Sequence, residues 1–319
     1  MAPRPFQVDP VLTAIVVGYR NPAIALIADQ VLPRVPTAAK FGWTRWTDAE
    51  SFSVPDGKVG RRGRVARVEF SATEVTDQVQ DYGWEGSIPQ TDIDDAAAQR
   101  AAKLSVYDPE ARTTTGLADI KVLAREQRVA NIVFNAASYD ASRKITLSGT
   151  SQLSDFTNSD PVGVINAGLD ATMLRPNTMV FSQSGWTKFR SNPRIVKAIM
   201  GGLSGDGMVT REQVRDLFEV QDVLVGAAQY NTAKKGQPTA LSRVWGKHIA
   251  LLHLNPLGGV GENPQPTFGF TASCGNGVAM RTEDPDVGLQ GGQTIRVGER
   301  VKEIVSASAC GYFIQNAFA

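Results

Sequence analysis

A helical pattern that begins at Asp108-Pro109 and continues to about residue 135 limits the folds that this chain can adopt. Aspartate is a favoured helix N-cap, and proline suits the first helical position. A helix over 109–135 would be about 40 Å long. Small or apolar residues recur along it at close to a 3.6-residue period, namely Leu117, Ile120, Leu123, Ala124, Ala130 and Phe134. A rod of this length with one apolar stripe predicts a spine against which a sheet lies.

The first forty residues predict an arm made of short pieces. Two apolar runs, VLTAIVVGY and IALIADQVL, are separated and bounded by prolines. A proline limits helix formation at its own position and at the residue before it. The prolines concerned are Pro10, Pro22, Pro33 and Pro36. We therefore expect this segment to lie against another part of the structure and to form no closed core of its own.

Residues 45–92 predict a long β-hairpin. Alternation of polar with apolar or aromatic residues is clearest in Arg67-Val68-Glu69-Phe70-Ser71, and turn signals occur at Pro55-Asp56-Gly57, Gly60 and Gly63. The segment has few large apolar side chains, so it cannot bury much surface alone. We expect it to project and to pack on a neighbour.

The remainder predicts alternating helices and strands followed by strands alone. Residues 92–107 should be helical, because the aspartates of DIDD suit a helix N-terminus. Residues 160–262 predict a mixed α/β domain with a central sheet, in which Asp160 caps one helix and Thr210 begins another through a capping box. The stretch RVWGKHIALLHL is predicted as one strand. The last sixty residues predict a second sheet beside the long helix.

Composition excludes several partners. The chain has 319 residues, of which 42% are hydrophobic and 20% are charged, as in ordinary soluble proteins. Its 33 Lys and Arg against 32 Asp and Glu give a net charge of +1, so no global field attracts nucleic acid or membrane. No apolar run approaches the length of a membrane span. Cys274 and Cys310 have no metal-binding or redox spacing and are expected to be reduced.

Residues that could carry catalysis do not form a recognisable set. His248 and His253 would lie on opposite faces of a strand, where they cannot bind one metal ion. There is no GxSxG motif, and GGLSGDGMVT lacks the lysine and glycine order of a nucleotide-binding loop. Helix capping and a solvated turn explain the acidic TDIDD and RTEDPDVG stretches. We predict no catalytic residue, cofactor or metal, although a soluble α/β enzyme with a site after Val223-Leu224-Val225 remains an alternative.

One local cluster of charge lies within the predicted hairpin. Three interpretations are open for it: contact with nucleic acid, a solvated loop, and pairing with acidic residues of another subunit. Nucleic-acid contact would call for stacking aromatics or a groove-reading helix nearby, and neither is evident. We favour the contact between subunits. The cations are Lys58, Arg61, Arg62, Arg64 and Arg67.

The order of these predicted elements resembles the major capsid proteins of tailed bacteriophages, which share the Hong Kong 97-like shell fold. NTMVFSQSGWTKFRSNPRI resembles the family's segment in which an apolar strand runs into a Trp-containing helix. LFEVQDVLVGAAQYN with SRVWGKHIALLHLNP resembles its helix, strand, loop and strand segment. GERVKEIVSASACGYFIQNAF resembles its closing strands. The resemblance covers nearly the whole chain and depends on the order of these segments.

This resemblance implies an α+β fold with five parts. They are an N-terminal arm (1–44), an extended β-hairpin loop (45–92), a peripheral domain with the spine helix and a sheet (93–160), an α/β axial domain (161–262), and C-terminal strands that return to the peripheral domain (263–319). In the axial domain, Gln229, Tyr230 and Asn231 become candidate contacts near a symmetry axis.

The implied function is that of a structural protein and not of an enzyme. Copies would self-assemble as pentamers and hexamers into the icosahedral shell of a virion, in the cytoplasm of the bacterial host. The expected partners are further copies of the chain, a separate scaffolding protein, a portal, a possible decoration protein, and packaged double-stranded DNA bound without sequence specificity. The alternative with the same fold is the shell of an encapsulin nanocompartment.

Overall fold

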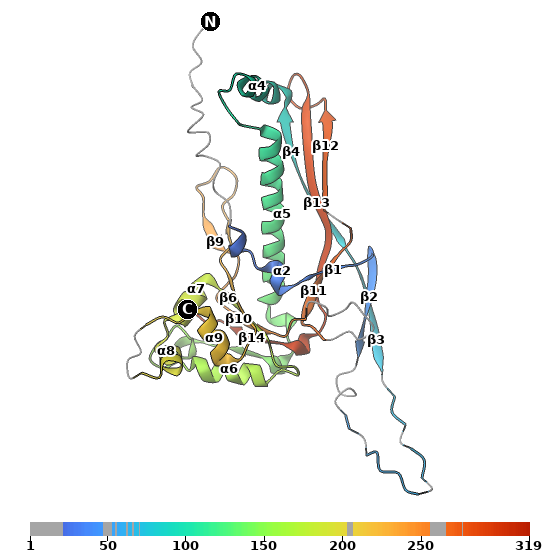
Figure 1. The fold of residues 1–319 in the computed structure, drawn as a ribbon, viewed down its shortest axis with the longest axis vertical. Helices are drawn as coiled ribbons and strands as arrows, with labels where there is room; N and C mark the ends of the chain where they lie inside the picture. Colours follow the sequence, from blue (N-terminus) through green and yellow to red (C-terminus); the bar gives the residue numbers. More distant parts are fainter. Residues whose placement is uncertain are drawn as a thin grey trace.

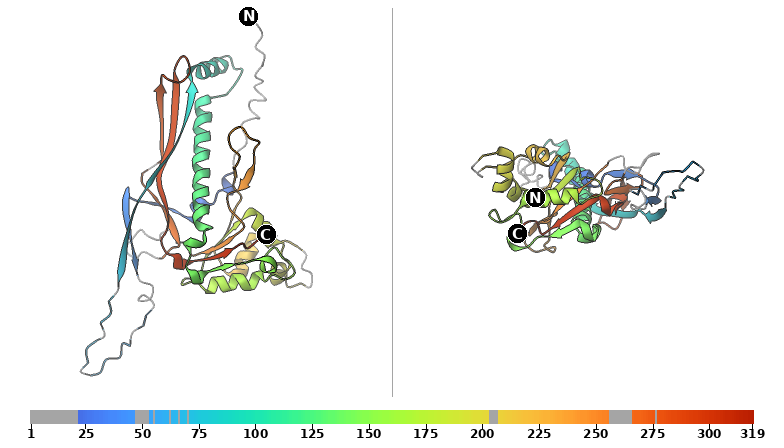
Figure 2. Two further views of the ribbon diagram at one scale, coloured as in Figure 1. Left: turned by 180° about the vertical axis from the view of Figure 1, so that it is seen from behind. Right: turned by 90° about the horizontal axis from the view of Figure 1, so that it is seen from below.

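The computed structural model describes residues 22–46, 53–54, 56–61, 63–65, 67–69, 71–202, 207–255, 266–275 and 277–319. Within these residues, a long helix and a narrow sheet form a spine that extends from an α/β unit at one end (Figure 1). A two-stranded ribbon projects beside the spine sheet, on the side away from the α/β unit (Figures 1 and 2). The short 3-10 helices are η1 (Ala23–Ala25), η2 (Ala136–Ser138), η3 (Ala141–Arg143), η4 (Gly149–Ser151) and η5 (Ser308–Cys310).

The spine helix is α5 (Pro109–Val133), which confirms the helix predicted from residue 109. The Asp108 carboxylate accepts hydrogen bonds from the backbone N–H groups of Glu110 and Ala111, at 3.0 and 3.3 Å, and so caps the helix. The predicted apolar stripe is only partly correct, because Ile120 is 47% exposed.

The spine sheet is built around β13 (Gly292–Val305), which pairs antiparallel with three other strands. Leu117 of α5 packs in one buried cluster with Ile88, Ile295 and Val297 of this sheet, which confirms that a sheet lies along the spine. The other strands are β1 (Arg34–Pro36), β4 (Gln80–Pro89), β11 (Gly269–Ser273) and β12 (Val278–Asp284).

The central sheet of the α/β unit has five strands, in the order β5-β14-β10-β6-β7. One of them corrects the sequence analysis. The C-terminal strand β14 pairs with β10 and β5 here, whereas 263–319 was expected to return as a whole to the sheet beside the spine helix. The strands are β5 (Lys144–Thr146), β6 (Thr178–Ser182), β7 (Asp222–Gly226), β10 (Ile249–Leu252) and β14 (Gly311–Gln315).

Alternating side chains bury both faces of the central sheet. Met179 and Phe181 belong to one core cluster, whereas Val180 between them belongs to another. The first cluster lies under the helices of residues 161–218, and the second includes Val129 and Val133 near the end of α5. The central sheet therefore joins the α/β unit to the spine.

The helices of the α/β unit begin where the sequence predicts. The Asp160 carboxylate accepts from the Gly163 N–H, and Thr210 and Gln213 form the predicted capping box. Two boundaries differ from the prediction. Helix α4 ends near residue 101 and not 107, and within RVWGKHIALLHL only β10 and Arg243, the last residue of the preceding strand, are in β-strands. The helices of the α/β unit are α6 (Pro161–Asp170), α7 (Gln183–Arg190), α8 (Pro193–Met200) and α9 (Arg211–Phe218), whereas α4 (Gln90–Ala101) lies at the far end of the spine (Figure 1).

Two ribbons leave the body of the molecule. Strands β2 (Lys40–Trp46) and β3 (Ala72–Gln78) pair antiparallel along their whole length and form the base of the predicted hairpin. The alternation at 67–71 predicted a strand there, and this prediction is wrong for the described residues 67–69 and 71, which are not in a strand. Strands β8 (Gln229–Asn231) and β9 (Leu241–Arg243) form the second, shorter ribbon.

The junction after β7 is a close packing contact. Gly226 ends that strand beside the fully buried ring of Trp245, and an added Cβ at Gly226 would overlap the indole. Val223 and Val225 point into the core on the helical face of the sheet. The glycine after this apolar run is therefore required by packing.

We predict that Gly226→Ala destabilises the unassembled subunit by about 1–3 kcal/mol, because the extra methyl group overpacks a filled core. The matched control is Gly116→Ala in α5, where an added Cβ meets no atom within 4 Å. That control should stabilise by about 0.5–1 kcal/mol, since alanine is the better helix former. Urea unfolding measures both, and an unchanged midpoint for Gly226→Ala would contradict the packing argument.

Candidate assembly surfaces and the anchor of the arm

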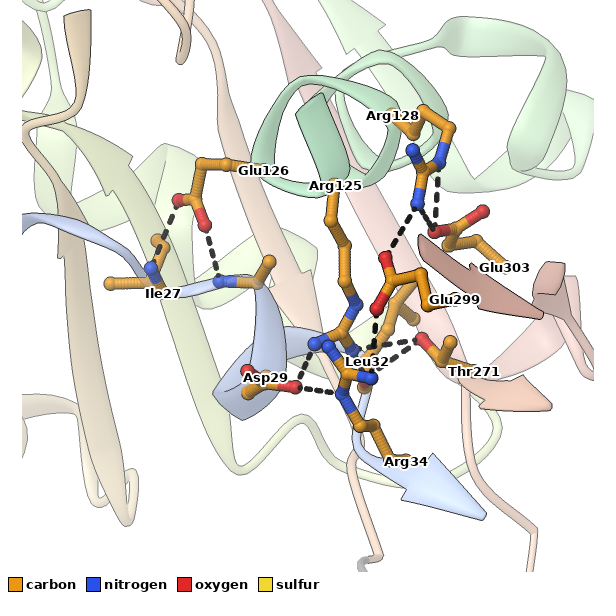
Figure 3. Close-up of polar contacts among 11 residues, drawn as sticks. Ile27, Asp29, Leu32, Arg34, Arg125, Glu126, Arg128, Thr271, Glu299 and Glu303 are labelled. Carbon is orange, nitrogen blue, oxygen red and sulfur yellow. Dashed lines mark hydrogen bonds and ion pairs between the residues drawn. The ribbon is translucent and has the colours of Figure 1, made fainter. Parts of the chain in front are cut away.

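A fully buried carboxylate holds the arm to the spine helix. Glu126 of α5 is 0% exposed, and its two carboxylate oxygens accept hydrogen bonds from the backbone N–H groups of Ile27 and Ala28, at 2.9 and 2.8 Å (Figure 3). These N–H groups belong to the first turn of α2 (Ala28–Val31) and the residue before it. The indole N–H of Trp245 donates to the same carboxylate at 2.6 Å. One side chain thus joins the arm, the spine and the α/β unit.

Arg125, the neighbour of Glu126, holds the next part of the arm. Its guanidinium is 2% exposed and pairs with the Asp29 carboxylate. It also donates to the carbonyl oxygen of Leu32 at 3.1 Å and to the Thr271 hydroxyl at 3.2 Å (Figure 3). Thr271 lies on β11, so the same side chain connects the arm to the spine sheet.

A second arginine of α5 neutralises two carboxylates of β13. Arg128 lies 2.9 Å from Glu303 and 3.3 Å from Glu299, whose side chains are 4% and 3% exposed. Arg34 on β1 pairs with Glu299 at 3.1 Å, so the arm also shares this network. The Arg128 guanidinium lies 3.8 Å from the centre of the Tyr82 ring, in a cation–π contact. The two buried carboxylates are therefore each paired with an arginine, although Arg34 and Arg128 are themselves 38% and 20% exposed.

Burial changes the acidity of this network. Desolvation raises the pKa of the Glu126 carboxyl above its ordinary value, and the donors Ile27, Trp245 and Ala28 oppose that rise in part. Desolvation also lowers the pKa of Arg125, against the opposing effect of Glu299. We refer to Glu126, Arg125 and their partners in residues 22–36 as the arm anchor.

Sequence reasoning did not find the arm anchor, although one signal was present. Glu126, Val129, Ala130 and Val133 share one face of α5 at three- and four-residue spacing, and all four are buried. A charged residue in such an apolar register indicates a buried partner. The partner was not identifiable, because it is backbone about a hundred residues away in the sequence.

The predicted basic contacts lie together in the segment between β2 and β3. Lys58, Arg61, Arg64 and Arg67 are exposed, and Arg67 lies 3.7 Å from Glu69, also exposed. Arg62, the fifth predicted contact, lies outside the described residues. We call the described residues between 53 and 71 the basic segment. Its side chains face solvent and not the body of the subunit.

The other predicted contacts form strand β8 and lie far from the basic segment (Figure 1). Gln229 and Tyr230 are half-buried, whereas Asn231 is exposed. The Asn231 side chain accepts from the N–H groups of Ala233 and Ala240, at 3.0 Å each. It therefore closes the β8–β9 ribbon, a role that the sequence did not predict.

Reactive side chains do not converge within the described part of the chain. No group of three His, Cys, Asp or Glu residues there could hold a metal ion. His253 Nδ1 lies 2.9 Å from the carbonyl oxygen of Arg175, and His248 accepts from the N–H of Asn316. Among the same residues, no helix is both long and apolar enough to cross a bilayer.

Comparison with known proteins identifies the family. No protein-family model matches this sequence. However, the major capsid protein of Pseudomonas phage JBD67 is 41% identical over 320 residues, which cover 100% of both chains. The chain belongs to the family of phage major capsid proteins. The major capsid protein of Burkholderia phage BcepMu is a more distant relative, 28% identical over 316 residues, with 96% of this chain and 95% of the relative covered.

Solved structures confirm the expected α+β, Hong Kong 97-like fold. A phage-related protein from Bordetella bronchiseptica RB50 matches with a TM-score of 0.65 and 22% identity, covering 97% of each chain. The capsid of cyanophage P-SCSP1u matches with a TM-score of 0.58 and 10% identity, covering 99% of this chain and 91% of the other. The SrpI encapsulin of Synechococcus elongatus PCC 7942 shares the fold with a TM-score of 0.53 and 10% identity. The sequence relatives are capsid proteins, so the encapsulin alternative is not favoured.

We predict that Glu126→Gln destabilises the unassembled subunit by about 1–3 kcal/mol, because the new amide group places a donor opposite a backbone N–H and leaves it unpaired. Glu74→Gln on the exposed face of β3 is the matched control and should change the stability little. Urea unfolding of both variants measures the difference. Equal midpoints for the two variants would contradict the arm anchor.

The raised pKa of Glu126 also predicts a dependence on pH. The ordinary value is 4.5, and the folded chain holds its proton to a higher pH than the unfolded chain does. The stabilisation from this group is therefore complete below about pH 4.5 and is lost as the pH rises through the folded pKa. The stability difference between the unmodified subunit and Glu126→Gln should shrink across that window. A difference that grows with pH would contradict the assigned shift.

Proposed function

We propose that this chain assembles into the icosahedral shell, made of pentamers and hexamers, that encloses the double-stranded DNA genome of a tailed phage. The observation that carries the proposal is the 41% identity to a phage major capsid protein along the full length of both chains. The elongated subunit supports it, because arms and ribbons that leave the body suit contacts between copies. Heterologous contacts of this kind close into rings.

We also propose which residues form each domain of the subunit. Residues 161–262 would form the axial domain at the five-fold and six-fold vertices, and residues 93–160 with the spine strands of 263–319 would form the peripheral domain. Strand β14 would act with the axial domain, since it pairs inside the central sheet. The arm (1–44) and the extended loop (45–92) would contact neighbouring subunits.

The proposed partners include other proteins of the same phage. They are a separate scaffolding protein, a portal and a possible decoration protein, with assembly in the cytoplasm of the bacterial host. Packaged DNA would be held without sequence specificity. The net charge of +1 fits a shell that encloses DNA without binding it strongly, because non-specific affinity for DNA comes from cationic charge.

The contacts between subunits are proposed for the exposed cations of the basic segment, Lys58, Arg61, Arg64 and Arg67, together with Arg62. Strand β8, with Gln229, Tyr230 and Asn231, is proposed as a contact near a symmetry axis. What supports both is the position of each group on a ribbon that leaves the body of the subunit (Figure 1).

Negative-stain microscopy tests the proposal most simply. The chain is expressed with the other structural proteins of its phage, and lysates are examined for particles. We expect closed shells that contain this chain as their main protein. Monomers or dimers alone, under every assembly condition, would contradict the proposed function.

We predict that reversing Arg61, Arg62 and Arg64 to Glu leaves the subunit folded but impairs formation or expansion of particles. Exposed charges contribute little to the stability of a subunit, whereas like charges facing each other across an interface cost several kcal/mol. The control replaces the same three arginines with lysine, which conserves the charge. Unfolding curves and particle counts measure the two effects, and normal particles from the glutamate variant would remove this segment from the essential contacts.

A further inference from the structure

The β8–β9 ribbon carries positive charge and no negative charge. Residues 223–261, which include the whole ribbon, contain no Asp or Glu. Lys234 and Lys235 belong to the connection of residues 232–240 between the two strands, which we call the ribbon turn, and Arg243 lies on β9. All three cations are exposed. A surface of this composition attracts a partner with negative charge.

The subunit itself does not neutralise these charges. Among the described residues, no carboxylate forms an ion pair with Lys234, Lys235 or Arg243. The Arg243 guanidinium donates to the carbonyl oxygen of Ala227 at 2.9 Å, which holds this side chain at the base of the ribbon and leaves its charge uncompensated. The partner of the ribbon must therefore supply the anions.

Hydrogen bonds give the ribbon turn a defined shape. The Asn231 side chain accepts from the N–H groups of Ala233 and Ala240, at 3.0 Å each, and so ties the two ends of the turn together. Within the turn, the N–H of Gln237 donates to the carbonyl oxygen of Lys234 at 3.0 Å. The ribbon leaves the body of the subunit (Figure 1), so its two lysines are presented to a partner on an ordered backbone. Order of this kind lowers the entropy that binding costs.

The ribbon turn lacks the apolar groups that a contact between proteins would use. Its sequence, TAKKGQPTA, includes no large apolar side chain. Lysine is depleted at the centre of protein interfaces, where aromatic residues are enriched. Lysine, threonine and glutamine side chains are, in contrast, common donors to DNA phosphates. The composition of the turn therefore favours a phosphate backbone over an acidic protein surface.

The basic segment differs from the ribbon turn in both respects. It contains Asp56 and Glu69 among its cations, and it exposes Val54 and Val65, which are 95% and 79% exposed. Charges of both signs with exposed apolar groups suit the contact between subunits that is proposed for it. Cations alone suit a polyanion, so the two ribbons have different partners.

We propose that the ribbon turn contacts the phosphate backbone of the packaged double-stranded DNA, with Lys234 and Lys235 as the groups that meet the phosphates. The inference rests on the proposed function, and it assigns the turn to the inner face of the shell. Phosphate contacts carry no sequence information, so this contact is the same for any packaged sequence. It is weak and sensitive to salt, because its free energy comes from the release of counterions.

Lysine acetylation of the unmodified chain tests this contact in the particle. Unassembled subunits, DNA-free particles and DNA-filled particles are treated with an acetylating reagent, and mass spectrometry measures the rate at each lysine. We expect Lys234 and Lys235 to react several-fold more slowly in DNA-filled particles than in the other two states. The exposed Lys103 and Lys197, which lie outside the ribbon, are internal controls and should react alike in both kinds of particle.

Three results of this measurement would contradict the contact. Equal rates at Lys234 and Lys235 in all three states would show that nothing covers the turn. Equal protection in both kinds of particle would assign the turn to a neighbouring protein. Equal slowing at the control lysines would show that DNA crowds the subunit without a contact at the turn. If the unmodified chain forms no particles, the proposed shell itself fails.

The salt dependence of DNA binding by the unassembled subunit tests the contact independently of assembly. Fluorescence anisotropy measures the affinity for a mixed-sequence DNA duplex. Lys234→Gln with Lys235→Gln should lower the slope of log affinity against log salt by about 2, since each phosphate contact contributes about 0.9. Lys234→Arg with Lys235→Arg should keep the slope, and so should Lys103→Gln with Lys197→Gln, which removes the same charge elsewhere. No binding by the unmodified subunit at low salt, an unchanged slope in the first variant, or an equal loss in the last would overturn the contact.

Discussion

The buried carboxylate of Glu126 is the contact on which the arrangement of this subunit depends. A carboxylate without partners would be far too costly to bury, and here three N–H donors from two distant segments surround it. Two of those donors are backbone groups of the arm, so the arm must follow one path for the charge to be tolerated. The third donor, Trp245, is held by its close contact with Gly226. The position of the arm and the packing of the α/β unit are therefore linked through one side chain.

The surrounding ions extend this constraint to the spine sheet. Arg125 of α5 donates a hydrogen bond to Thr271 on β11. Arg128 of α5 forms ion pairs with Glu299 and Glu303 on β13. Breaking such a buried pair is more costly than its net contribution to stability, because the remaining ion is left unpaired. The network thus specifies how the arm, the helix and the sheet lie relative to one another. A subunit with fixed internal geometry can present its two ribbons to neighbours in defined directions.

Local physical chemistry made much of the fold predictable from the sequence. The caps at Asp108 and Asp160 and the capping box at Thr210 each depend on neighbouring residues, and each is found as expected. Contacts between residues far apart in the sequence were harder to predict. The sequence does not indicate that β14 pairs with β10, nor that the charge of Glu126 is matched by backbone N–H groups of the arm. The predicted contacts between subunits, such as Arg61, rest on exposure and charge and remain predictions.

Amide hydrogen exchange at Ile27 and Ala28 tests most directly whether the Glu126 carboxylate anchors the arm. These N–H groups lie in a short 3-10 and α-helical segment that could not protect them alone, since isolated helices of this length are marginal in water. The account predicts slow exchange at both positions in the unmodified subunit and fast exchange in Glu126→Gln, with little change at core amides such as Val180. Fast exchange at Ile27 and Ala28 in the unmodified subunit would contradict it.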